Sequence, residues 1–201
     1  MLYADFAMNA SSTLFGIENS WLLGAARHPS SNCDERVAGV PISLLVIHGI
    51  SLPPNEFGGG YVEDLFLNRL DCTAHPYFAK LQGVKVSAHL FVRRTGEVLQ
   101  FVPFNKRAWH AGQSDFQGRA ACNDFSIGIE LEGADQIPYE PLQYQRLAMI
   151  TRLLMQHYPD IRRETIVGHS DIAPGRKTDP GDAFDWNCFF SLLEKSAENE
   201  Q

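Results

Sequence analysis

The stretch ISLLVIH, residues Ile42 to His48, is a continuous apolar run that ends on a histidine. A run of this length and composition is typical of a strand that is buried on both faces of a sheet. FSIGIELEG (Phe125 to Gly133) alternates and is rich in Ile, which predicts a second strand, and ETIVGH (Glu164 to His169) predicts a short third one. The sequence therefore predicts a sheet in which two of the strands end on a histidine.

Further elements are predicted around these strands. VSAHLFVRR and EVLQFVP flank Thr95 and Gly96, which predicts an antiparallel hairpin. Apolar residues at helical spacing predict a helix in YVEDLFLNRL, a long helix from Pro141 to Tyr158 and a last helix from Trp186 to Glu194. Strands mixed with helices and a hairpin favour an α/β fold, a single domain with a central mixed β-sheet flanked by helices.

The first forty residues lack such periodicity, and turn-forming residues interrupt them in HPSSNCDER. We therefore expect residues 1–40 to form an irregular arm that packs on the domain. Residues 41–195 are expected to form the domain itself, and residues 196–201 a short C-terminal tail.

Composition and charge narrow the classes of function. The chain has 201 residues, a net charge of −7 and a sequence pI of about 5.4. A protein whose main partner is nucleic acid needs clustered Lys and Arg to neutralise phosphates, so we expect no such partner. The N-terminus lacks the cationic start and apolar stretch of a secretory signal, and no apolar run approaches the roughly 18 residues of a membrane span. We therefore expect a cytoplasmic monomer with no membrane partner, whose four scattered cysteines are reduced.

Three side chains stand out as candidate metal ligands. His48 and His169 lie at the predicted carboxyl ends of strands, where α/β proteins tend to bind ligands. Asp179 follows in a loop rich in Gly and Pro that can fold back on the strand end. Two imidazoles and one carboxylate suit a catalytic zinc with a fourth position open. A histidine at a strand end is also commonly a hydrogen-bonded structural residue, so spacing alone leaves both interpretations open.

Two further charged residues fit the metal hypothesis. Glu130 lies within the apolar alternation of FSIGIEL, where burial of a carboxylate is unfavourable unless it is paired or used. Glu132 has the same strand parity, so one of the two could be structural. Lys177 precedes Asp179 by two residues and would lie near the same metal, where an ammonium group can stabilise negative charge on a carbonyl oxygen.

Six collinear motifs resemble one enzyme family. They are LLVIHGISLPPNEFGGG, HPYF, VSAHLFVRR, RAWHAG, CNDFSIGIELEG and GHSDIAPGRKTDPGDAFDW, within residues 44–186. Together they resemble the cytoplasmic 1,6-anhydro-N-acetylmuramyl-L-alanine amidases of Gram-negative bacteria, the AmpD-type enzymes. The wider group shares a fold with phage T7-type amidase lysozymes and peptidoglycan-recognition proteins. The resemblance implies a zinc-dependent amidase domain that cleaves the lactyl-L-alanine bond of anhydro-muropeptides during peptidoglycan recycling.

The resemblance also implies residue roles. The zinc ligands would be His48, His169 and Asp179. The catalytic carboxylate would be Glu130 rather than Glu132, and the catalytic lysine of the family matches Lys177. Candidate walls of the substrate cleft are Trp109, His110, Asn123 and Tyr61. Candidate partners for the carboxylates of the peptide stem are Lys85, Arg93, Arg107 and Arg119, with Lys85 and Arg119 preferred.

Two positions depart from the family pattern. Gly49 stands directly after the first predicted zinc ligand, where Asn is common, and it cannot donate a side-chain hydrogen bond to a substrate. Ser170 follows the second predicted zinc ligand, where Cys is frequent, and is not a predicted ligand. We therefore expect the Gly49 difference to bear on substrate affinity.

Two alternative functions share this fold. A non-catalytic module that binds peptidoglycan fragments usually has a zinc ligand replaced, whereas all three predicted ligands are present here. An endolysin-like amidase that acts on intact cell wall would be expected to have an export route or a wall-binding domain, and neither is predicted. The sequence therefore favours recycling of soluble fragments.

Overall fold

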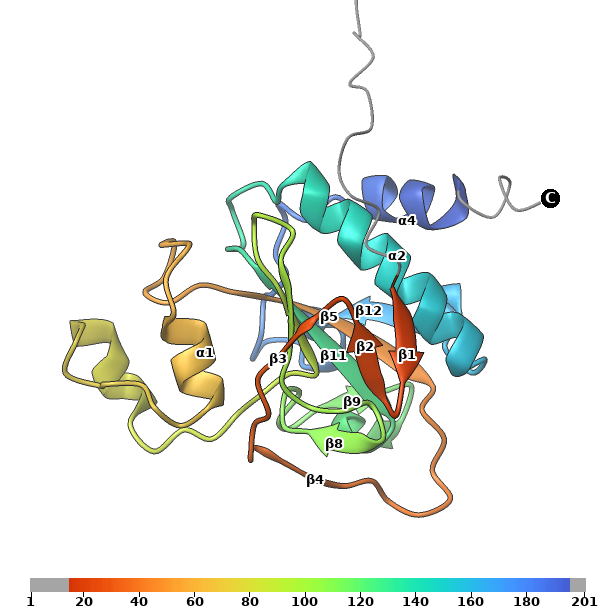
Figure 1. Cartoon of the computed structure of the whole chain (residues 1–201), viewed down its shortest axis with the longest axis horizontal. Helices are drawn as coiled ribbons and strands as arrows, with labels where there is room; N and C mark the ends of the chain where they lie inside the picture. The colour runs from red at the N-terminus through yellow and green to blue at the C-terminus, as the bar shows by residue number, and fades with distance from the viewer. Residues whose placement is uncertain (1–14, 196–201) are drawn as a thin grey trace, which may run out of the picture.

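A six-stranded mixed sheet forms the centre of the computed structural model, which describes residues 15–195 (Figure 1). Its strands lie in the order β12 (Ile166–Gly168), β5 (Leu44–Ile50), β11 (Ser126–Glu132), β6 (Leu90–Val92), β7 (Val98–Gln100) and β3 (Ala26–Arg27). The first four run parallel to one another, β6 and β7 form the predicted antiparallel hairpin, and β3 runs parallel to β7. The predicted mixed sheet is confirmed, and the apolar run from Leu44 forms β5, which has a neighbouring strand on each side.

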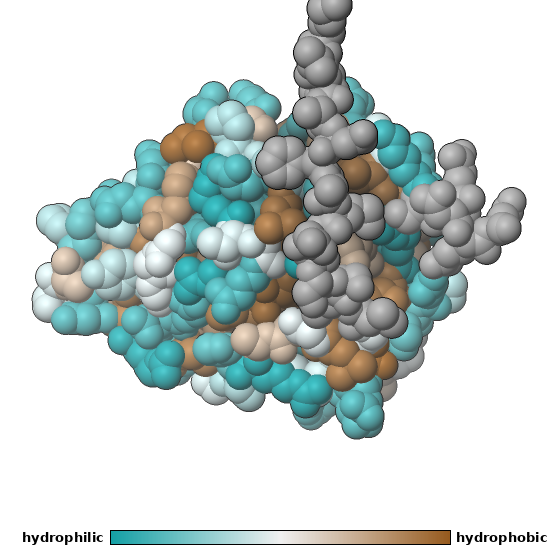
Figure 2. All heavy atoms as spheres, turned by 45° about the horizontal axis from the view of Figure 1, so that its top comes forward, coloured by the Kyte–Doolittle hydropathy of each residue, from teal (hydrophilic) through white to brown (hydrophobic). Residues whose placement is uncertain are grey.

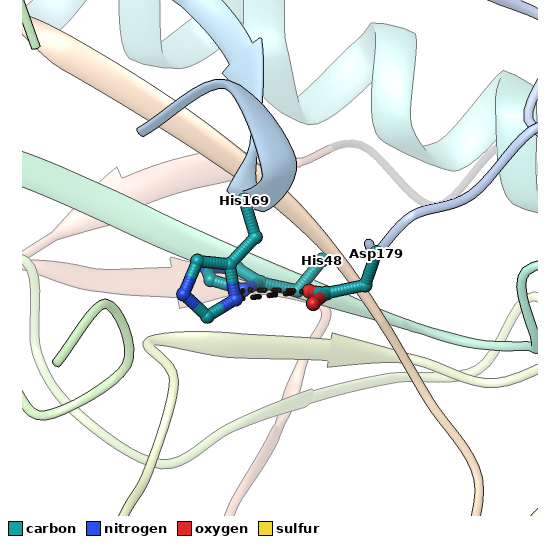
Figure 3. Close-up of side chains that lie close together, drawn as sticks. All are labelled: His48, His169 and Asp179. Atoms are coloured by element: carbon teal, nitrogen blue, oxygen red, sulfur yellow. Dashed lines mark hydrogen bonds and ion pairs between the residues drawn. The ribbon is translucent and has the colours of Figure 1, made fainter. Parts of the chain in front are cut away.

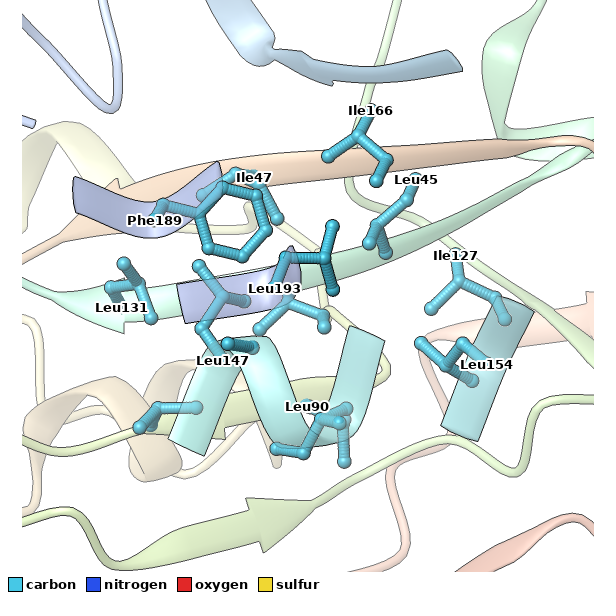
Figure 4. Close-up of a cluster of buried hydrophobic side chains, with 14 of the residues drawn as sticks. Leu45, Ile47, Leu90, Ile127, Leu131, Leu147, Leu154, Ile166, Phe189 and Leu193 are labelled. Carbon is cyan, nitrogen blue, oxygen red and sulfur yellow. The ribbon is translucent and has the colours of Figure 1, made fainter. Parts of the chain in front are cut away.

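Two helices cover one face of this sheet. They are α2 (Pro141–His157) and α4 (Trp186–Lys195), which lie beside each other in Figure 1. Proline suits the first position of α2 because its missing N–H would be unpaired there in any case. Figure 4 shows Leu147 and Leu154 of α2 and Phe189 of α4 packed with Leu45 and other sheet residues into the largest hydrophobic cluster.

Shorter helices and small sheets surround this core. The helices are α1 (Tyr61–Phe66), α3 (His169–Ile172) and the 3₁₀ segments η1 (Pro76–Leu81), η2 (Cys122–Asp124) and η3 (Arg163–Thr165). Two-stranded antiparallel sheets pair β1 (Gly16–Glu18) with β2 (Trp21–Leu23), β4 (Cys33–Glu35) with β8 (Lys106–Ala108), and β9 (Asp115–Phe116) with β10 (Arg119–Ala120).

The prediction of an irregular arm is wrong for residues 15–40. This segment contributes β1, β2 and β4, and its β3 extends the main sheet. The buried side chain of Gln100 holds it, because its oxygen accepts from Leu22 N at 2.6 Å and its amide donates to Ser20 O at 3.1 Å. Strands of two or three residues show no periodicity, so they depend on such tertiary partners. The rest of the predicted arm (residues 1–14) and the predicted tail (residues 196–201) lie outside the described residues.

Strand parity places polar side chains on the face opposite to α2 and α4. Leu45 and Ile47 of β5 point into the cluster under the helices, whereas Leu44 and Val46 pack in a separate cluster on the other face. His48 shares the parity of the latter pair, so it lies on the face away from the helices. β11 runs parallel in register with β5, and the alignment puts Glu130 directly beside His48.

The outer surface is mixed in character. The face in Figure 2 carries hydrophilic residues interspersed with smaller hydrophobic areas. Among residues 15–195, no helix combines the length and the apolar composition that crossing a bilayer would need.

Candidate metal centre and active site

Three side chains converge at the carboxyl end of the central strands. Nδ1 of His48 lies 3.0 Å from Nδ1 of His169 and 3.2 Å from Oδ2 of Asp179, and the second histidine lies 3.0 Å from the same oxygen. Figure 3 shows the two rings and the carboxylate pointing toward one point. The candidate ligand atoms all lie within 4.8 Å of one another. The structure therefore brings together the three residues that the sequence predicted as metal ligands.

Each of the three comes from a different element. His48 lies near the end of β5, and His169 begins α3 directly after β12. Asp179 lies in the loop between α3 and α4, and its carbonyl accepts a hydrogen bond from Ser170 N at 3.0 Å. That bond ties the loop to the first turn of α3. The carboxylate is thereby held beside the histidine that precedes it by ten residues.

The hydrogen bonds of His169 suit a metal ligand. The other ring nitrogen of His169, Nε2, lies 3.1 Å from the carbonyl oxygen of Ala111, which can only accept, so Nε2 carries the proton. Its Nδ1 then presents a lone pair to the carboxylate of Asp179 and to the ring of His48. A lone pair that faces a carboxylate is favourable only where a proton or a metal cation lies between the two groups. Imidazole nitrogen and carboxylate oxygen are also ligands that zinc accepts, so the donor set fits that metal.

Glu130 has the properties of a functional carboxylate. Its Oε1 lies 3.9 Å from His48 Nδ1, and its buried Oε2 has no hydrogen-bond partner among the described residues. Burial raises the pKa of this carboxyl group well above its ordinary value, and the charge of Asp179 raises it further, while Lys177 acts in the opposite direction. Carboxyl groups with such a raised pKa are suited to exchange protons near neutral pH.

Glu132, by contrast, is bonded to the backbone. Its two oxygens accept hydrogen bonds from the backbone N–H groups of Gly58 and Arg94, the latter at 3.0 Å. These bonds fix the glycine-rich loop after β5 and the turn of the β6–β7 hairpin to the end of β11. The side chain is 5% exposed and its oxygens are fully engaged, so this carboxylate is not free to take part in chemistry.

A cleft of about 630 Å³ opens over the candidate metal ligands. Its lining includes Glu130 and Lys177 at the end that holds His169 and Asp179. Apolar side chains line the other part of the cleft, with Trp109 among them: Leu52, Leu65, Tyr77, Leu81, Val84 and Val86. The cleft thus combines a polar end, where chemistry could occur, with an apolar surface that could hold an uncharged group.

The predicted substrate contacts divide into two groups. Trp109 and His110 line the cleft, although the ring nitrogens of His110 point to His48 and Ser126. Four others do not line it. The Asn123 side-chain oxygen accepts from two backbone N–H groups, Arg119 lies over the ring of Phe125, Tyr61 packs on the edge of Phe78, and Lys85 is exposed.

Arg93 and Arg107, the other two candidate partners for the carboxylates of the peptide stem, are engaged in ion pairs. The guanidinium group of Arg93 contacts Glu63 and Glu97. That of Arg107 contacts Asp34 and Asp124. Neither residue lines the cleft, so the structure does not bring the predicted cations for a peptide stem to this site.

Tyr139 is a residue of the site region that the sequence did not single out. Its buried hydroxyl donates to the carbonyl of Pro180 at 2.9 Å and thereby supports the loop that carries Asp179. A Cβ atom at Gly49 would lie 2.2 Å from this hydroxyl. The glycine that departs from the family pattern therefore makes room for the tyrosine. No local pattern in the sequence links these two positions, which are 90 residues apart.

Comparisons with known proteins identify the family of the chain. Residues 38–182 match the family model described as N-acetylmuramoyl-L-alanine amidase. The 1,6-anhydro-N-acetylmuramyl-L-alanine amidase AmpD of Escherichia coli K12 is 55% identical over 179 residues, which cover 89% of this chain and 97% of that protein.

Solved structures give the same result. The crystal structure of a selenomethionine AmpD derivative superposes with a TM-score of 0.86 at 53% identity, over 88% of this chain and 98% of that one. A complex of the E. coli amidase AmiD with anhydro-N-acetylmuramic acid-L-Ala-D-γ-Glu-L-Lys has a TM-score of 0.56 at 30% identity, over 89% of this chain and 65% of that one.

Proposed function

The chain belongs to the N-acetylmuramoyl-L-alanine amidase family, and we propose that it hydrolyses 1,6-anhydro-N-acetylmuramyl peptides in peptidoglycan recycling. The bond cleaved is the amide between the lactyl group of the sugar and the L-alanine of the peptide. One observation carries the proposal: His48, His169 and Asp179 converge beside Glu130, whose buried Oε2 has no hydrogen-bond partner among the described residues, and a cleft lined by Glu130, His169 and Asp179 opens there. The substrate class is supported by the identity to AmpD over nearly its whole length.

We propose zinc as the metal that His48, His169 and Asp179 hold. Three protein ligands leave a fourth position open, and zinc there would lower the pKa of water and polarise a carbonyl group. The convergence of two imidazole nitrogens and a carboxylate oxygen on one point supports this choice.

Glu130 is proposed as the proton carrier of the reaction. Its free oxygen accepts a proton from the water that attacks the lactyl carbonyl carbon. When the carbon–nitrogen bond breaks, the same carboxyl group gives a proton to the alanine nitrogen, so the peptide leaves as a free amine. The other product is the anhydro-muramic acid with a carboxylate on its lactyl group. The raised pKa of Glu130 supports both halves of this exchange.

Two cleft residues are proposed to hold the substrate around this bond. The ammonium group of Lys177 stabilises the negative charge that develops on the carbonyl oxygen. The indole of Trp109 offers a flat apolar surface on which a sugar ring could stack. Both line the cleft that contains Glu130, which supports these assignments. A cytoplasmic location, a monomeric state and the absence of a nucleic-acid or membrane partner remain predictions.

The test is product analysis by mass spectrometry. The purified, zinc-loaded protein is incubated with anhydro-muramyl tripeptide, with and without a chelator. Release of free tripeptide that stops on chelation and returns with added zinc is the expected result. Zinc binding without cleavage of this substrate would point to another substrate, such as intact cell wall. Neither zinc binding nor cleavage would refute the enzyme and favour a binding module.

A further inference from the structure

The dipeptide His110–Ala111 contacts the rear of both histidines of the candidate metal centre. Nδ1 of His110 lies 2.9 Å from His48 Nε2, and the two rings are nearly perpendicular, at 88°. The carbonyl oxygen of Ala111 lies 3.1 Å from His169 Nε2. In each metal-ligand candidate, Nδ1 faces the centre and Nε2 faces this dipeptide. One short segment therefore reaches both rings on the side away from the metal position.

The hydrogen-bond partners of His110 allow an arrangement of protons that suits two metal ligands. Its Nε2 lies 3.0 Å from Ser126 Oγ, and its Nδ1 faces His48. If Ser126 accepts from Nε2–H, then Nδ1 of His110 accepts from His48 Nε2–H. That arrangement leaves Nδ1 of His48 without a proton. The carbonyl of Ala111 has the same effect on His169, because it accepts from Nε2–H of that ring. Both ligand candidates then present lone pairs to the same point.

The dipeptide is itself held rigidly. Asn123 Oδ1 accepts from the backbone N–H of His110 at 3.2 Å and from that of Ala111 at 2.8 Å. The ring of His110 packs against the backbone of Gly128, where a Cβ atom would lie 2.4 Å from its Nδ1. Glycine at this strand position therefore leaves the space that the ring needs. The contacts come from η2 and β11, so the two histidines are braced by elements that carry no candidate ligand.

We propose that His110 and Ala111 are positioning residues that fix both metal-binding histidines in the Nε2–H tautomer, with Nδ1 directed at the metal. This inference rests on the proposed function, because it takes His48 and His169 as zinc ligands. Groups that hydrogen-bond to a metal-ligating histidine orient its ring, and their loss typically weakens metal affinity about 10- to 100-fold. The proposal also gives Asn123 and Ser126 a function, since they hold the dipeptide and its tautomer.

The first test measures zinc dissociation constants of full-length variants against a competing chromophoric chelator. His110→Leu removes the acceptor for His48 and should weaken zinc binding about 10- to 100-fold. His110→Asn keeps an acceptor atom near the Nδ1 position and should restore most of the affinity. Because a carbonyl cannot be removed by substitution, Asn123→Leu perturbs Ala111 indirectly, and Asn123→Asp is its matched control. A folded His110→Leu protein with wild-type affinity, or equal losses for Leu and Asn, would overturn the proposal.

The second test needs no activity. Long-range ¹H–¹⁵N spectra of the imidazoles in the zinc-loaded wild-type protein report the tautomer of each histidine. We expect His48, His110 and His169 all to carry the proton on Nε2. A proton on Nδ1 of His110 would overturn the inference even if the enzyme cleaves its substrate. Conversely, a wild-type protein that binds zinc but cleaves no anhydro-muropeptide would refute the proposed function while these spectra still decide the tautomers. They also decide the case if His110→Leu does not fold.

Discussion

Replacing Glu130 with glutamine should lower the rate of catalysis without changing the stability of the fold. The substitution keeps the shape of the side chain but removes the base that accepts a proton from water. General-base catalysis typically contributes about 10²- to 10⁴-fold to the rate, which corresponds to roughly 3–5 kcal/mol in the activation barrier. Neither oxygen of Glu130 makes a hydrogen bond that the fold needs, since one is unpartnered and the other lies 3.9 Å from His48. We therefore expect kcat to fall by that factor while zinc affinity and the free energy of unfolding stay nearly unchanged.

Glu132→Gln is the matched control on the same strand face. Its carboxylate accepts from two backbone N–H groups, of Gly58 and Arg94. An amide would keep one acceptor and turn a donor toward the other N–H group. Loss of a charge-assisted hydrogen bond costs about 1.5–3 kcal/mol, so this variant should be less stable by that amount. Its kcat, measured well below its unfolding temperature, should stay within a few-fold of wild type.

The assay is steady-state hydrolysis of anhydro-muramyl tripeptide, combined with zinc titration and urea unfolding of each variant. The two variants should show opposite patterns, with activity lost in one and stability in the other. A Glu130→Gln enzyme that retains more than about a tenth of wild-type kcat would refute the general-base assignment. A Glu130→Gln enzyme that loses zinc would show instead that this carboxylate supports the metal site.

Three further outcomes are expected. Lys177→Met should lower kcat about 10²- to 10³-fold at unchanged zinc affinity, with Lys177→Arg less affected, as measured in the same assay. Gly49→Ala should displace the Tyr139 hydroxyl from Pro180 and reduce the free energy of unfolding by about 1–3 kcal/mol, and the loss should shrink in a Tyr139→Phe background. Burial and the nearby Arg36 lower the pKa of His89 to about 3 from its ordinary 6.5, so the unfolded chain binds a proton there that the folded chain does not. The metal-free protein should therefore lose about 1.4 kcal/mol of stability per pH unit below about pH 6.5 from this residue alone, and urea unfolding of His89→Asn should lack that part of the slope.

The elements that the sequence predicted well have strong internal patterns. The run at Leu44–Ile50 is buried on both faces as its continuous apolar composition indicated, and α2 spans Pro141–His157 close to the predicted bounds. Both are long enough for periodicity to be visible. The short strands before residue 40 were missed because they hold their place through partners such as Gln100, which lies more than 70 residues away. Tertiary hydrogen bonds of that kind leave no local pattern.

The candidate site, like the fold, was predicted only in part from the sequence. Residues whose chemistry is unusual in their context, a histidine at a strand end or a glutamate in an apolar strand, stood out in the sequence and converge in the structure. His110 and Asn123 also stood out, but as substrate contacts, whereas their polar atoms face His48, Ser126 and backbone N–H groups. A polar residue near an active site can face the substrate. It can instead contact the metal-binding side chains on the side away from the metal. Only three-dimensional contacts distinguish the two.

The face of β11 opposite the helices shows why strand parity alone could not assign a role to each of its residues. Every second residue of SIGIELE lies on this face, and the four differ only in what lies against them. Ser126 contacts the His110 ring, and Gly128 leaves room for that ring. Glu130 lies beside His48 with a free oxygen, and Glu132 binds two backbone N–H groups. The alternation that predicts the strand thus fixes which residues can reach the site. Their contacts depend on neighbours that approach from other elements, so two glutamates with identical parity have different surroundings and are proposed to have different roles.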